Sequence, residues 1–552
     1  MSTLAIIPAR GGSKGIPRKN LRPVNGKPLL FYSIQACLMA EEIDAVVVST
    51  DDDEIALFAE RFGAKALIRP QSLSGDEVTI DPVVIHATEQ AELQQGTSYD
   101  FVITVQPTSP LIRSVELDEA LLKLKQSDQS DSILSVVDDR HLCWTTDGTG
   151  KTIPEYEKRV NRQHLPARFK ETGALIACRR NILDSGTRIG NNILLYEMPP
   201  SRSFDIDSYT DLVLCEAVLR RKRIAFVVTG SKTTGTGHAY RALLIANELV
   251  HHDLCFIMHA DDTVALDIIR SHNYETHVSQ DIQTTIQYLK PDLVINDTLD
   301  TAVDYVNFLK HLHAKVVTFE DLGGGADISD LVINALYPSS ANDRDDSRVK
   351  TGPQYFCLRD EFIHLPPKKN NSDETNLLLT FGGVDEGNLS LRCLKSAIKV
   401  IKELHITCRI TVIVGSGYQH FSDLTKNAQK YQDIASIEII QKTQRISDFM
   451  VNADFAITSG GRTVLELAST TTPMIVICQN QRETSHDLLK TNPGIINLGL
   501  RTDVIDSQIE DAINRLLSDK TFRSSMEEEL RDVDLTRGKQ RVIGLINDIL
   551  GN

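Results

Sequence analysis

Cysteine and tryptophan are sparse in this sequence of 552 residues, which has nine scattered cysteines and one tryptophan. No CxxC pair and no clustering of cysteine with histidine occurs, so the spacing indicates neither a zinc site nor a disulfide framework. No apolar run approaches the roughly 20 residues that a membrane span needs, and the N-terminus lacks the pattern of a signal peptide. We therefore expect a cytoplasmic protein without a membrane partner.

Positive charge is in the minority, with 59 Lys and Arg against 75 Asp and Glu and a formal net charge of -16. Such a surface repels polyanions, so we expect no nucleic-acid partner. An anionic ligand has to be held by a local basic site, which favours small phosphorylated molecules. The length exceeds what one hydrophobic core supports and predicts several domains.

Strand-like and helix-like segments alternate along the chain, and the alternation restarts twice. Apolar runs at 4–9 and 45–50 flank a segment with helical periodicity, which indicates a strand, helix, strand unit and a parallel α/β sheet. The pattern predicts a domain at 1–222, a lobe at 223–365 and a second lobe at 366–552. The less regular stretch at 140–175 suits substrate contacts or a dimer arm.

A glycine-rich basic turn follows the first apolar run, in LAIIPARGGSKGIPRKNL at 4–21. Glycines let backbone N–H groups approach phosphate oxygens, and the lysines and arginines would neutralise the charge. The spacing of Gly11, Gly12 and Gly15 matches neither the P-loop nor the dinucleotide pattern. From the residues alone, the turn is either a phosphate cradle or an exposed basic loop.

Two further patterns carry chemistry and each has a structural alternative. Asp205 and Asp207 stand two apart in an extended stretch, so both point to one face, as Mg²⁺ coordination by oxygen ligands requires. Alternatively, Asp207 or Ser208 caps a helix that starts near Tyr209. His238 begins a predicted helix after a second glycine-rich turn, where it is either a general base or a structural residue.

Five ordered motifs in the first 222 residues resemble the CMP-sialic acid synthetases: the glycine-rich opening, IRP at 68–70, VQPTSPLIR at 105–113, NRQHLPARFKETGALI at 161–176 and FDIDSYTDL at 204–212. The resemblance implies a Rossmann-like nucleotidyltransferase domain and a homodimer. The ligands would be CTP and a nonulosonic acid of the sialic, pseudaminic or legionaminic type. The sugar's anomeric hydroxyl would attack the α-phosphate of CTP and release pyrophosphate.

The resemblance also assigns roles to residues of this sequence. Lys19 and Asp207 would be catalytic, Asp205 and Asp207 would hold Mg²⁺, and other positions would bind the nucleotide (Arg10, Gly11, Gly12, Ser13, Lys14, Asn20) or face the substrate (Arg69, Gln106, Arg162, Gln163). Relatives often have Asn-Gly-Ala where this chain has Thr172-Gly173-Ala174, a departure that concerns the acyl groups of the sugar.

Residues 223–552 resemble the UDP-sugar hydrolase of the pseudaminic acid pathway, through DLVINDT at 292–298, LTFGGVDEGN at 379–388 and the long motif at 453–481. The resemblance implies two Rossmann-like lobes of a B-type glycosyltransferase architecture that bind a UDP-sugar. His238 would activate water, Asp297 would contact the sugar, and other residues would bind the nucleotide (Gly382, Gly383, Ser459, Gly460, Gly461, Glu466).

One departure weakens the match to a hydrolase. Relatives carry a tyrosine shortly after the aspartate that ends the DLVI strand, whereas this chain has Asp297-Thr298-Leu299. A glycosyltransferase and a catalytically silent nucleotide-sugar-binding module therefore stay open as alternatives. The sequence as a whole predicts a bifunctional enzyme of nonulosonic acid biosynthesis.

Overall fold

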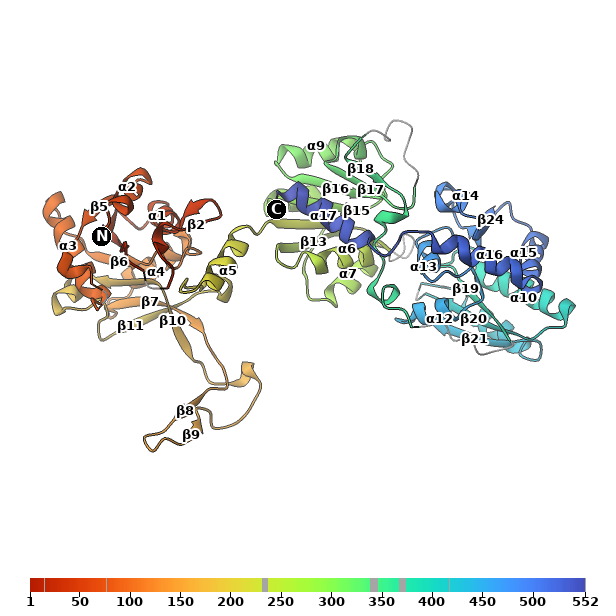
Figure 1. The fold of residues 1–552 in the computed structure, drawn as a ribbon, viewed down its shortest axis with the longest axis horizontal. Helices are drawn as coiled ribbons and strands as arrows, with labels where there is room; N and C mark the ends of the chain where they lie inside the picture. The colour runs from red at the N-terminus through yellow and green to blue at the C-terminus, as the bar shows by residue number, and fades with distance from the viewer. Residues whose placement is uncertain are drawn as a thin grey trace. The chain divides into compact units, whose positions relative to one another are not determined.

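A computed structural model describes residues 1–13, 15–75, 77–230, 237–337, 346–366, 374–415 and 417–551. The chain folds into two compact units, Met1–Arg221 and Lys222–Asn552 (Figure 1). We call them the first and the second unit and describe each by itself.

The first unit contains a seven-stranded sheet in the order β11-β7-β10-β6-β1-β4-β5. Its strands are β1 (Thr3–Pro8), β4 (Ala45–Thr50), β5 (Lys65–Ile68), β6 (Phe101–Val105), β7 (Ser132–Asp138), β10 (Phe169–Arg179) and β11 (Ile193–Glu197). Only β10 runs antiparallel to its neighbours β6 and β7. The helices are α1 (Leu29–Leu38), α2 (Asp53–Arg61), α3 (Ile80–Gln95), α4 (Ser114–Lys125) and α5 (Tyr209–Leu219).

Helices cover both faces of the sheet at β1, which explains why its sequence is apolar without interruption. Ala5 and Ile7 pack with residues of α1, α2 and α4, while Leu4 and Ile6 pack with residues of α3. The direction of strand order reverses between β1 and β6. Ligands of open α/β sheets bind at such a switch point, at the carboxyl ends of the strands.

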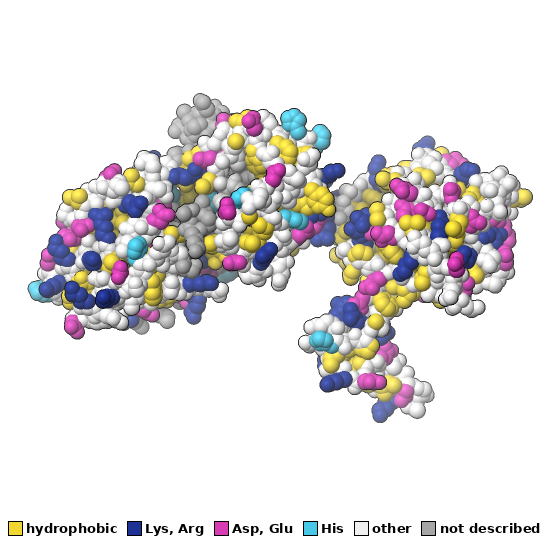
Figure 2. Space-filling model, turned by 180° about the vertical axis from the view of Figure 1, so that it is seen from behind, with side chains coloured by type: hydrophobic (Ala, Val, Ile, Leu, Met, Phe, Trp, Pro, Cys, Tyr) yellow, Lys and Arg dark blue, Asp and Glu magenta, His cyan; other side chains and the backbone are white. Residues whose placement is uncertain are grey.

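The irregular stretch at 140–175 forms an arm that leaves the sheet at the ends of β7 and β10 (Figure 1). It carries the hairpin of β8 (Trp144–Thr146) and β9 (Thr152–Pro154) and the short helix η3 (Arg162–His164). Figure 2 shows hydrophobic, basic and acidic side chains mixed over this arm. A homodimer formed through it stays a prediction.

The second unit contains two parallel sheets. The first lobe has β12 (Arg223–Val228), β13 (Asp253–His259), β14 (Glu275–Ser279), β15 (Leu293–Asp297), β16 (Lys315–Phe319), β17 (Leu331–Asn334) and β18 (Val349–Thr351). The second lobe has β19 (Thr375–Thr380), β20 (Cys408–Val414), β21 (Ser436–Gln441), β22 (Phe455–Thr458), β23 (Met474–Cys478) and β24 (Ile495–Leu500). The orders are β14-β13-β12-β15-β16-β17-β18 and β21-β20-β19-β22-β23-β24.

Both sheets place their first six strands in the order third, second, first, fourth, fifth, sixth, which is the dinucleotide-binding arrangement. Their switch points lie between β12 and β15 and between β19 and β22. The predicted fold class, an α/β chain with three Rossmann-like sheets, is confirmed.

The helices of the second unit cover these sheets. Those that follow first-lobe strands are α6 (Gly237–Glu248), α7 (Thr263–Arg270), α8 (Ile282–Leu289) and α9 (Val303–His311). Those of the later sequence are α10 (Leu389–Leu404), α11 (Phe421–Lys430), α12 (Ile446–Asn452), α13 (Thr463–Ser469), α14 (Leu488–Thr491), α15 (Asp506–Ser518), α16 (Lys520–Arg531) and α17 (Gly538–Leu550). The last of these, α17, returns to the first lobe, where Val542 and Ile546 join the core of β12 and α6 (Figure 1).

Two expectations about the whole chain can be compared with the structure. All nine cysteines lie in the described residues and are free thiols. Within the described part of the chain, no helix combines the length and the apolar character that crossing a bilayer requires.

Candidate active sites

The glycine-rich turn after β1 lies at the switch point of the first sheet. The Gly11 N–H donates to the carboxylate of Asp51 over 2.9 Å, and the Asn20 amide donates to the Arg10 carbonyl over 2.9 Å. A Cβ built on Gly11 would lie 2.7 Å from the Asp52 carboxylate, so only glycine fits there, whereas Gly12 has no atom within 4 Å of such a Cβ. The turn is thus fixed at Gly11, where it contacts Asp51 and Asp52, and has open space beside Gly12.

The same turn contacts the aspartate pair from the far end of the unit. A Cβ on Gly15 would lie 2.8 Å from the Asp207 carbonyl oxygen. Lys19 Nζ donates to the Ile206 carbonyl over 2.7 Å and to the Asp207 carboxylate over 3.2 Å. The structure therefore brings Lys19 together with Asp207. Ser13 is half-buried in the turn, and Lys14 lies outside the described residues.

The capping alternative for the aspartate pair is resolved by the start of α5. Ser208 is its N-cap: the Asp211 N–H donates to the Ser208 hydroxyl, and the Asp211 carboxylate accepts from the Ser208 N–H. The side chain of Asp207 takes no part in this capping box and is 77% exposed. Its carboxylate is therefore available to a ligand.

The aspartate pair fits a divalent cation. Burial raises the pKa of Asp205, and repulsion from the negative charge of Asp207 raises it further, against the opposing effect of Lys19. A cation between the two carboxylates would relieve this repulsion. The described residues hold no cluster of three or more acidic, histidine or cysteine side chains able to bind a metal. Mg²⁺ commonly uses one or two carboxylates together with substrate phosphates, so a pair is sufficient.

Arg69, directly after β5, supplies a buried positive charge beside the turn. Its residue is 7% exposed, and its Nε and Nη2 atoms have no hydrogen-bond partner among the described residues. Burial lowers its pKa, the carboxylate of Asp51 (3.8 Å away) opposes this, and the charge of Arg10 lowers it further. A buried cation without a hydrogen bond is costly, so the arrangement favours an anionic ligand.

Gln106 follows β6 and lies at the same switch point. Its side-chain nitrogen is 3.3 Å from the position of a Cβ on Gly173, which has φ of +71° in a bulge of β10. The neighbouring Thr172 is buried, and its hydroxyl donates to Ser135 Oγ over 2.7 Å. Thr172, the position at which the sequence departs from relatives, therefore bonds within the sheet.

Arg162 and Gln163 lie on η3 of the arm and are exposed. The pKa of Asp138 is lowered first by its hydrogen bond to Arg140 and to a smaller extent by Arg162, which places Arg162 near the end of β7. Among the described residues, neither side chain forms a hydrogen bond or ion pair with the glycine-rich turn. Their substrate role stays a prediction.

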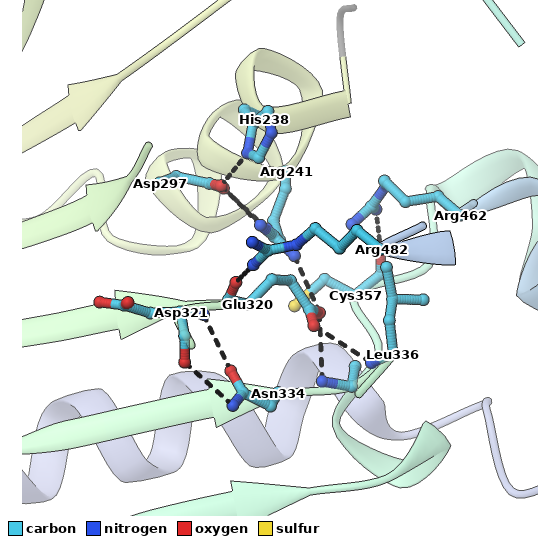
Figure 3. Close-up of polar contacts among 11 residues, drawn as sticks. His238, Arg241, Asp297, Glu320, Asp321, Asn334, Leu336, Cys357, Arg462 and Arg482 are labelled. Atoms are coloured by element: carbon cyan, nitrogen blue, oxygen red, sulfur yellow. Dashed lines mark hydrogen bonds and ion pairs between the residues drawn. The ribbon is translucent and has the colours of Figure 1, made fainter. Parts of the chain in front are cut away.

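A buried polar network lies at the switch point of the first lobe (Figure 3). His238, in the first turn of α6, has Nδ1 2.5 Å from Oδ1 of Asp297, the last residue of β15. Arg241, one turn further, donates from Nε and Nη2 to the same carboxylate over 2.7 and 2.5 Å. When Nδ1–H donates to Asp297, Nε2 of His238 is left as the acceptor, which is the form that a general base needs.

Arg241 also bridges Asp297 to a second buried carboxylate. Its Nη1 donates over 3.1 Å to Glu320, which in turn accepts from the backbone N–H groups of Ala335 and Leu336. Burial disfavours the charge on Arg241, but Asp297 and then Glu320 outweigh it and raise its pKa. Burial would likewise raise the pKa of Asp297, but Arg241 and then His238 hold it below its ordinary value.

Three arginines join the two lobes of the second unit. Arg482 donates from Nη1 to the Asp300 carboxylate over 2.8 and 2.9 Å, and from Nη2 to the carbonyl of Glu320. Arg359 Nε donates to Glu466 over 3.2 Å. Arg462 Nη2 donates to the Cys357 carbonyl over 3.1 Å (Figure 3). The predicted ribose ligand Glu466 is thus paired with Arg359, and its ribose role stays a prediction.

The glycine turns of the second lobe follow β19 and β22, at its switch point. Gly382 has φ of +78° and open space where a Cβ would be, while the Gly383 carbonyl accepts from the Gly417 N–H over 3.2 Å. After the buried Ser459, the Gly460 N–H donates to the Glu483 carboxylate over 3.0 Å. The Gly460 N–H, which was predicted to bind the nucleotide, is therefore already paired with Glu483. That the Gly461 N–H binds the nucleotide stays a prediction.

Sequence reasoning missed Arg241, Glu320, Arg462 and Arg482. For Arg241 a signal existed, because it interrupts an apolar helix face one turn after His238 in GHAYRALLIANEL. Its burial at 3% exposure required a carboxylate partner. The other three belong to loops. Glu320 contacts Arg241 across 79 residues of sequence, Arg462 contacts Cys357 across 105, and Arg482 contacts Asp300 across 182, so no local pattern indicates these contacts.

Comparison with known proteins concerns mainly the first unit. A family model described as cytidylyltransferase matches residues 4–182. The N-terminal part is cytidylyltransferase-like. An N-acylneuraminate cytidylyltransferase of Escherichia coli is 31% identical over 231 residues, covering 40% of this chain and 52% of the relative. A pseudaminic acid cytidylyltransferase of Campylobacter jejuni is 44% identical over 128 residues, covering 23% of this chain and 55% of the relative.

The chain spans about half the length of these curated relatives. Among solved structures, the crystal structure of MurG from Acinetobacter baumannii is 14% identical with a TM-score of 0.46, covering 59% of this chain and 99% of that one.

Proposed function

We propose that the first unit transfers a cytidylyl group from CTP to a nonulosonic acid. The observation that carries this proposal is the meeting, at one switch point, of the open glycine-rich turn, the buried Arg69 and the Lys19–Asp207 pair. Together they offer backbone donors and positive charge to phosphates beside two carboxylates. The similarity of residues 4–182 to cytidylyltransferases supports the same substrate class.

The chain's own residues would then act by binding and positioning. The turn and Arg69 would hold the triphosphate, and Lys19 would stay near its α-phosphate through its hydrogen bond to Ile206. The sugar hydroxyl loses its proton to solvent and its oxygen forms a bond to the α-phosphorus. The bond between that phosphorus and the bridging oxygen breaks, and pyrophosphate leaves with the electron pair. Mg²⁺ held by Asp205 and Asp207 would neutralise charge that develops on the phosphates.

The test is pyrophosphate release by the full chain from CTP, Mg²⁺ and a panel of sialic, pseudaminic and legionaminic acids, with the CMP-sugar identified by mass. Asp207→Ala should lower the rate roughly 100-fold or more, as loss of an electrostatic contact in a transition state does. Asp184→Ala removes an exposed carboxylate of the same unit and is the matched control. An unchanged rate in Asp207→Ala would overturn the metal assignment.

For the second unit we propose hydrolysis of a UDP-linked acetamido sugar, with His238 as general base. The hydrogen bond of Nδ1 to Asp297 favours this role, since it leaves Nε2 free to take a proton from water. A glycosyltransferase would use the same base to take a proton from an acceptor hydroxyl. A silent binding module would activate neither water nor an acceptor.

UDP release by the full chain from a panel of UDP-sugars, with and without candidate acceptors, separates these three functions. Release without acceptor that His238→Ala abolishes supports hydrolysis, and His272→Ala, an exposed histidine of the same lobe, is the control. Turnover only with an acceptor indicates a glycosyltransferase. Tight UDP binding without turnover indicates a binding module.

A further inference from the structure

Arg462 lies where the switch points of the two lobes meet. It follows the Ser459–Gly461 turn of the second lobe and reaches the beginning of α6 in the first. A Cβ built on Gly237, the residue before His238, would lie 2.9 Å from Cδ of Arg462. Figure 3 shows the Arg462 side chain entering from the second lobe toward the group formed by His238, Arg241 and Asp297.

The positive charge of Arg462 is not compensated by a carboxylate hydrogen bond. Nη2 donates to the carbonyl of Cys357, and the guanidinium lies over the Phe356 ring with 4.5 Å to its centroid. Nη1 is buried and has no hydrogen-bond partner among the described residues. Burial, and then repulsion from Arg241, lower the pKa of Arg462 to about 10.

The other two arginines at this place each have carboxylate partners, although Nε of Arg482 is buried without a hydrogen-bond partner among the described residues. Arg241 has Asp297 and Glu320, and Arg482 has Asp300. Arg462 alone among these three lacks an anionic hydrogen-bond partner, although it lies beside the predicted general base. Retaining such a cation in a buried place is costly unless a ligand supplies the missing anion.

We propose that Arg462 binds the diphosphate of the nucleotide sugar and stabilises it as the leaving group. This inference rests on the proposed nucleotide-sugar function of the second unit, and it names the residue that contacts the leaving group. The Ser459–Gly461 turn just before it brings backbone groups to the same place. Arg462 is thereby a catalytic residue of the second lobe that acts on the leaving group, whereas His238 of the first lobe acts on the attacking water.

In the reaction, His238 Nε2 takes a proton from water while the water oxygen forms a bond to the anomeric carbon. The bond between that carbon and the oxygen of the β-phosphate breaks, and its electron pair stays on the phosphate oxygen. Arg462 Nη1 donates to the diphosphate as this negative charge grows. The products are a nucleoside diphosphate, a free sugar and one proton, which His238 returns to solvent.

The test compares UDP, UMP and uridine as probes of the full chain. Their affinities are read from hydrogen-exchange protection of peptides that span α6 and α13, which assigns binding to this site. Three variants are used: Arg462→Met, which keeps length without charge; Arg462→Lys, which keeps charge; and Arg392→Met, which removes a paired arginine of the same lobe. Melting temperatures without ligand are measured in parallel.

Arg462→Met should weaken UDP binding roughly 10- to 100-fold, the size of one or two charge-assisted hydrogen bonds, and leave uridine binding within twofold. Arg462→Lys should recover part of the loss, and Arg392→Met should bind UDP as the unsubstituted chain does. Arg462→Met should melt no lower than Arg392→Met, because Arg462 has no carboxylate hydrogen bond to lose, whereas Arg392 is paired with Asp506.

Two results would overturn the proposal in different ways. If UDP protects the unsubstituted chain and Arg462→Met equally well, Arg462 does not bind the diphosphate, and the nucleotide site stands without it. If UDP does not protect this site in the unsubstituted chain, the nucleotide-sugar function itself fails. Equal loss of UDP and uridine binding with a lower melting temperature would make Arg462 a structural residue.

Discussion

The two candidate sites use the same residue types in opposite environments. In the first unit the Asp207 side chain is 77% exposed and pairs with Lys19 at 3.2 Å. In the second, Asp297 is 1% exposed and holds both His238 and Arg241 within 2.7 Å. An exposed carboxylate stays available to a ligand such as the proposed Mg²⁺, whereas the buried carboxylate is already paired with His238 and Arg241.

The largest expected effect comes from breaking the buried network. Arg241→Met leaves Asp297 and Glu320 without their shared cation, which should lower the free energy of unfolding of the second unit by about 3–5 kcal/mol. The first unit should be unaffected, because none of its residues belongs to this network. Urea unfolding followed by pulsed hydrogen exchange, read on peptides of each unit, measures the two effects separately.

Arg223→Met is the matched control for this substitution. Arg223 pairs with Asp253 and Glu275 near the surface of the same lobe, where such pairs are worth about 1 kcal/mol or less. Equal losses in the two variants would contradict the view that burial makes the Arg241 network costly to break.

A second, smaller effect depends on pH and again distinguishes the units. His486 of the second unit is 1% exposed, both ring nitrogens lack partners among the described residues, and burial lowers its pKa from 6.5 to about 4. The unfolded chain therefore binds a proton below pH 6.5 that the folded chain does not. Stability is lost as pH falls from 6.5 toward 4, by about 2 kcal/mol between pH 7 and 5.

Unfolding of the second unit at pH 7 and pH 5 in the unsubstituted chain and in His486→Leu measures this effect. The leucine variant should lose about 2 kcal/mol less over the same interval, since it has no group to titrate. The same pH dependence in both chains would show that other groups cause it.

The smallest effect concerns the first unit and separates capping from catalysis. Ser208→Ala removes the N-cap of α5 and should cost about 1 kcal/mol in the stability of the first unit. It should change the rate of pyrophosphate release far less than Asp207→Ala does. A larger loss of rate in Ser208→Ala would mean that the capping box itself fixes the reacting groups.

Much of the first site could be predicted because its parts are local patterns. The glycine-rich turn after an apolar strand and the spacing of Asp205 and Asp207 are visible in short stretches. Their meeting through Gly15 and Lys19, by contrast, depends on contacts across almost 190 residues of sequence. The resemblance of ordered motifs suggested this meeting, but spacing alone could not.

The second site was less predictable. His238 stood out because it begins a predicted helix after a glycine-rich turn, and the resemblance pointed to Asp297. Neither pattern revealed that Arg241 would lie between Asp297 and Glu320. Gly460 was expected to bind diphosphate through its N–H, and the structure shows that this N–H donates to Glu483. Such competition between an internal carboxylate and a ligand depends on where a distant loop packs.

The sequence by itself determined the alternation of strands and helices, and hence three sheets that are parallel except for β10, with glycine turns at the carboxyl ends of parallel strands. Periodicity and backbone freedom act over a few residues, so a short stretch contains all the information they need. Only the tertiary structure decided which charged side chains have a partner of opposite charge and which have none within hydrogen-bond distance. Arg241 and Arg462 both lie near His238, where burial excludes water. Arg241 has two carboxylates within hydrogen-bond distance, whereas Arg462 has a carbonyl, and this difference determines what each can do.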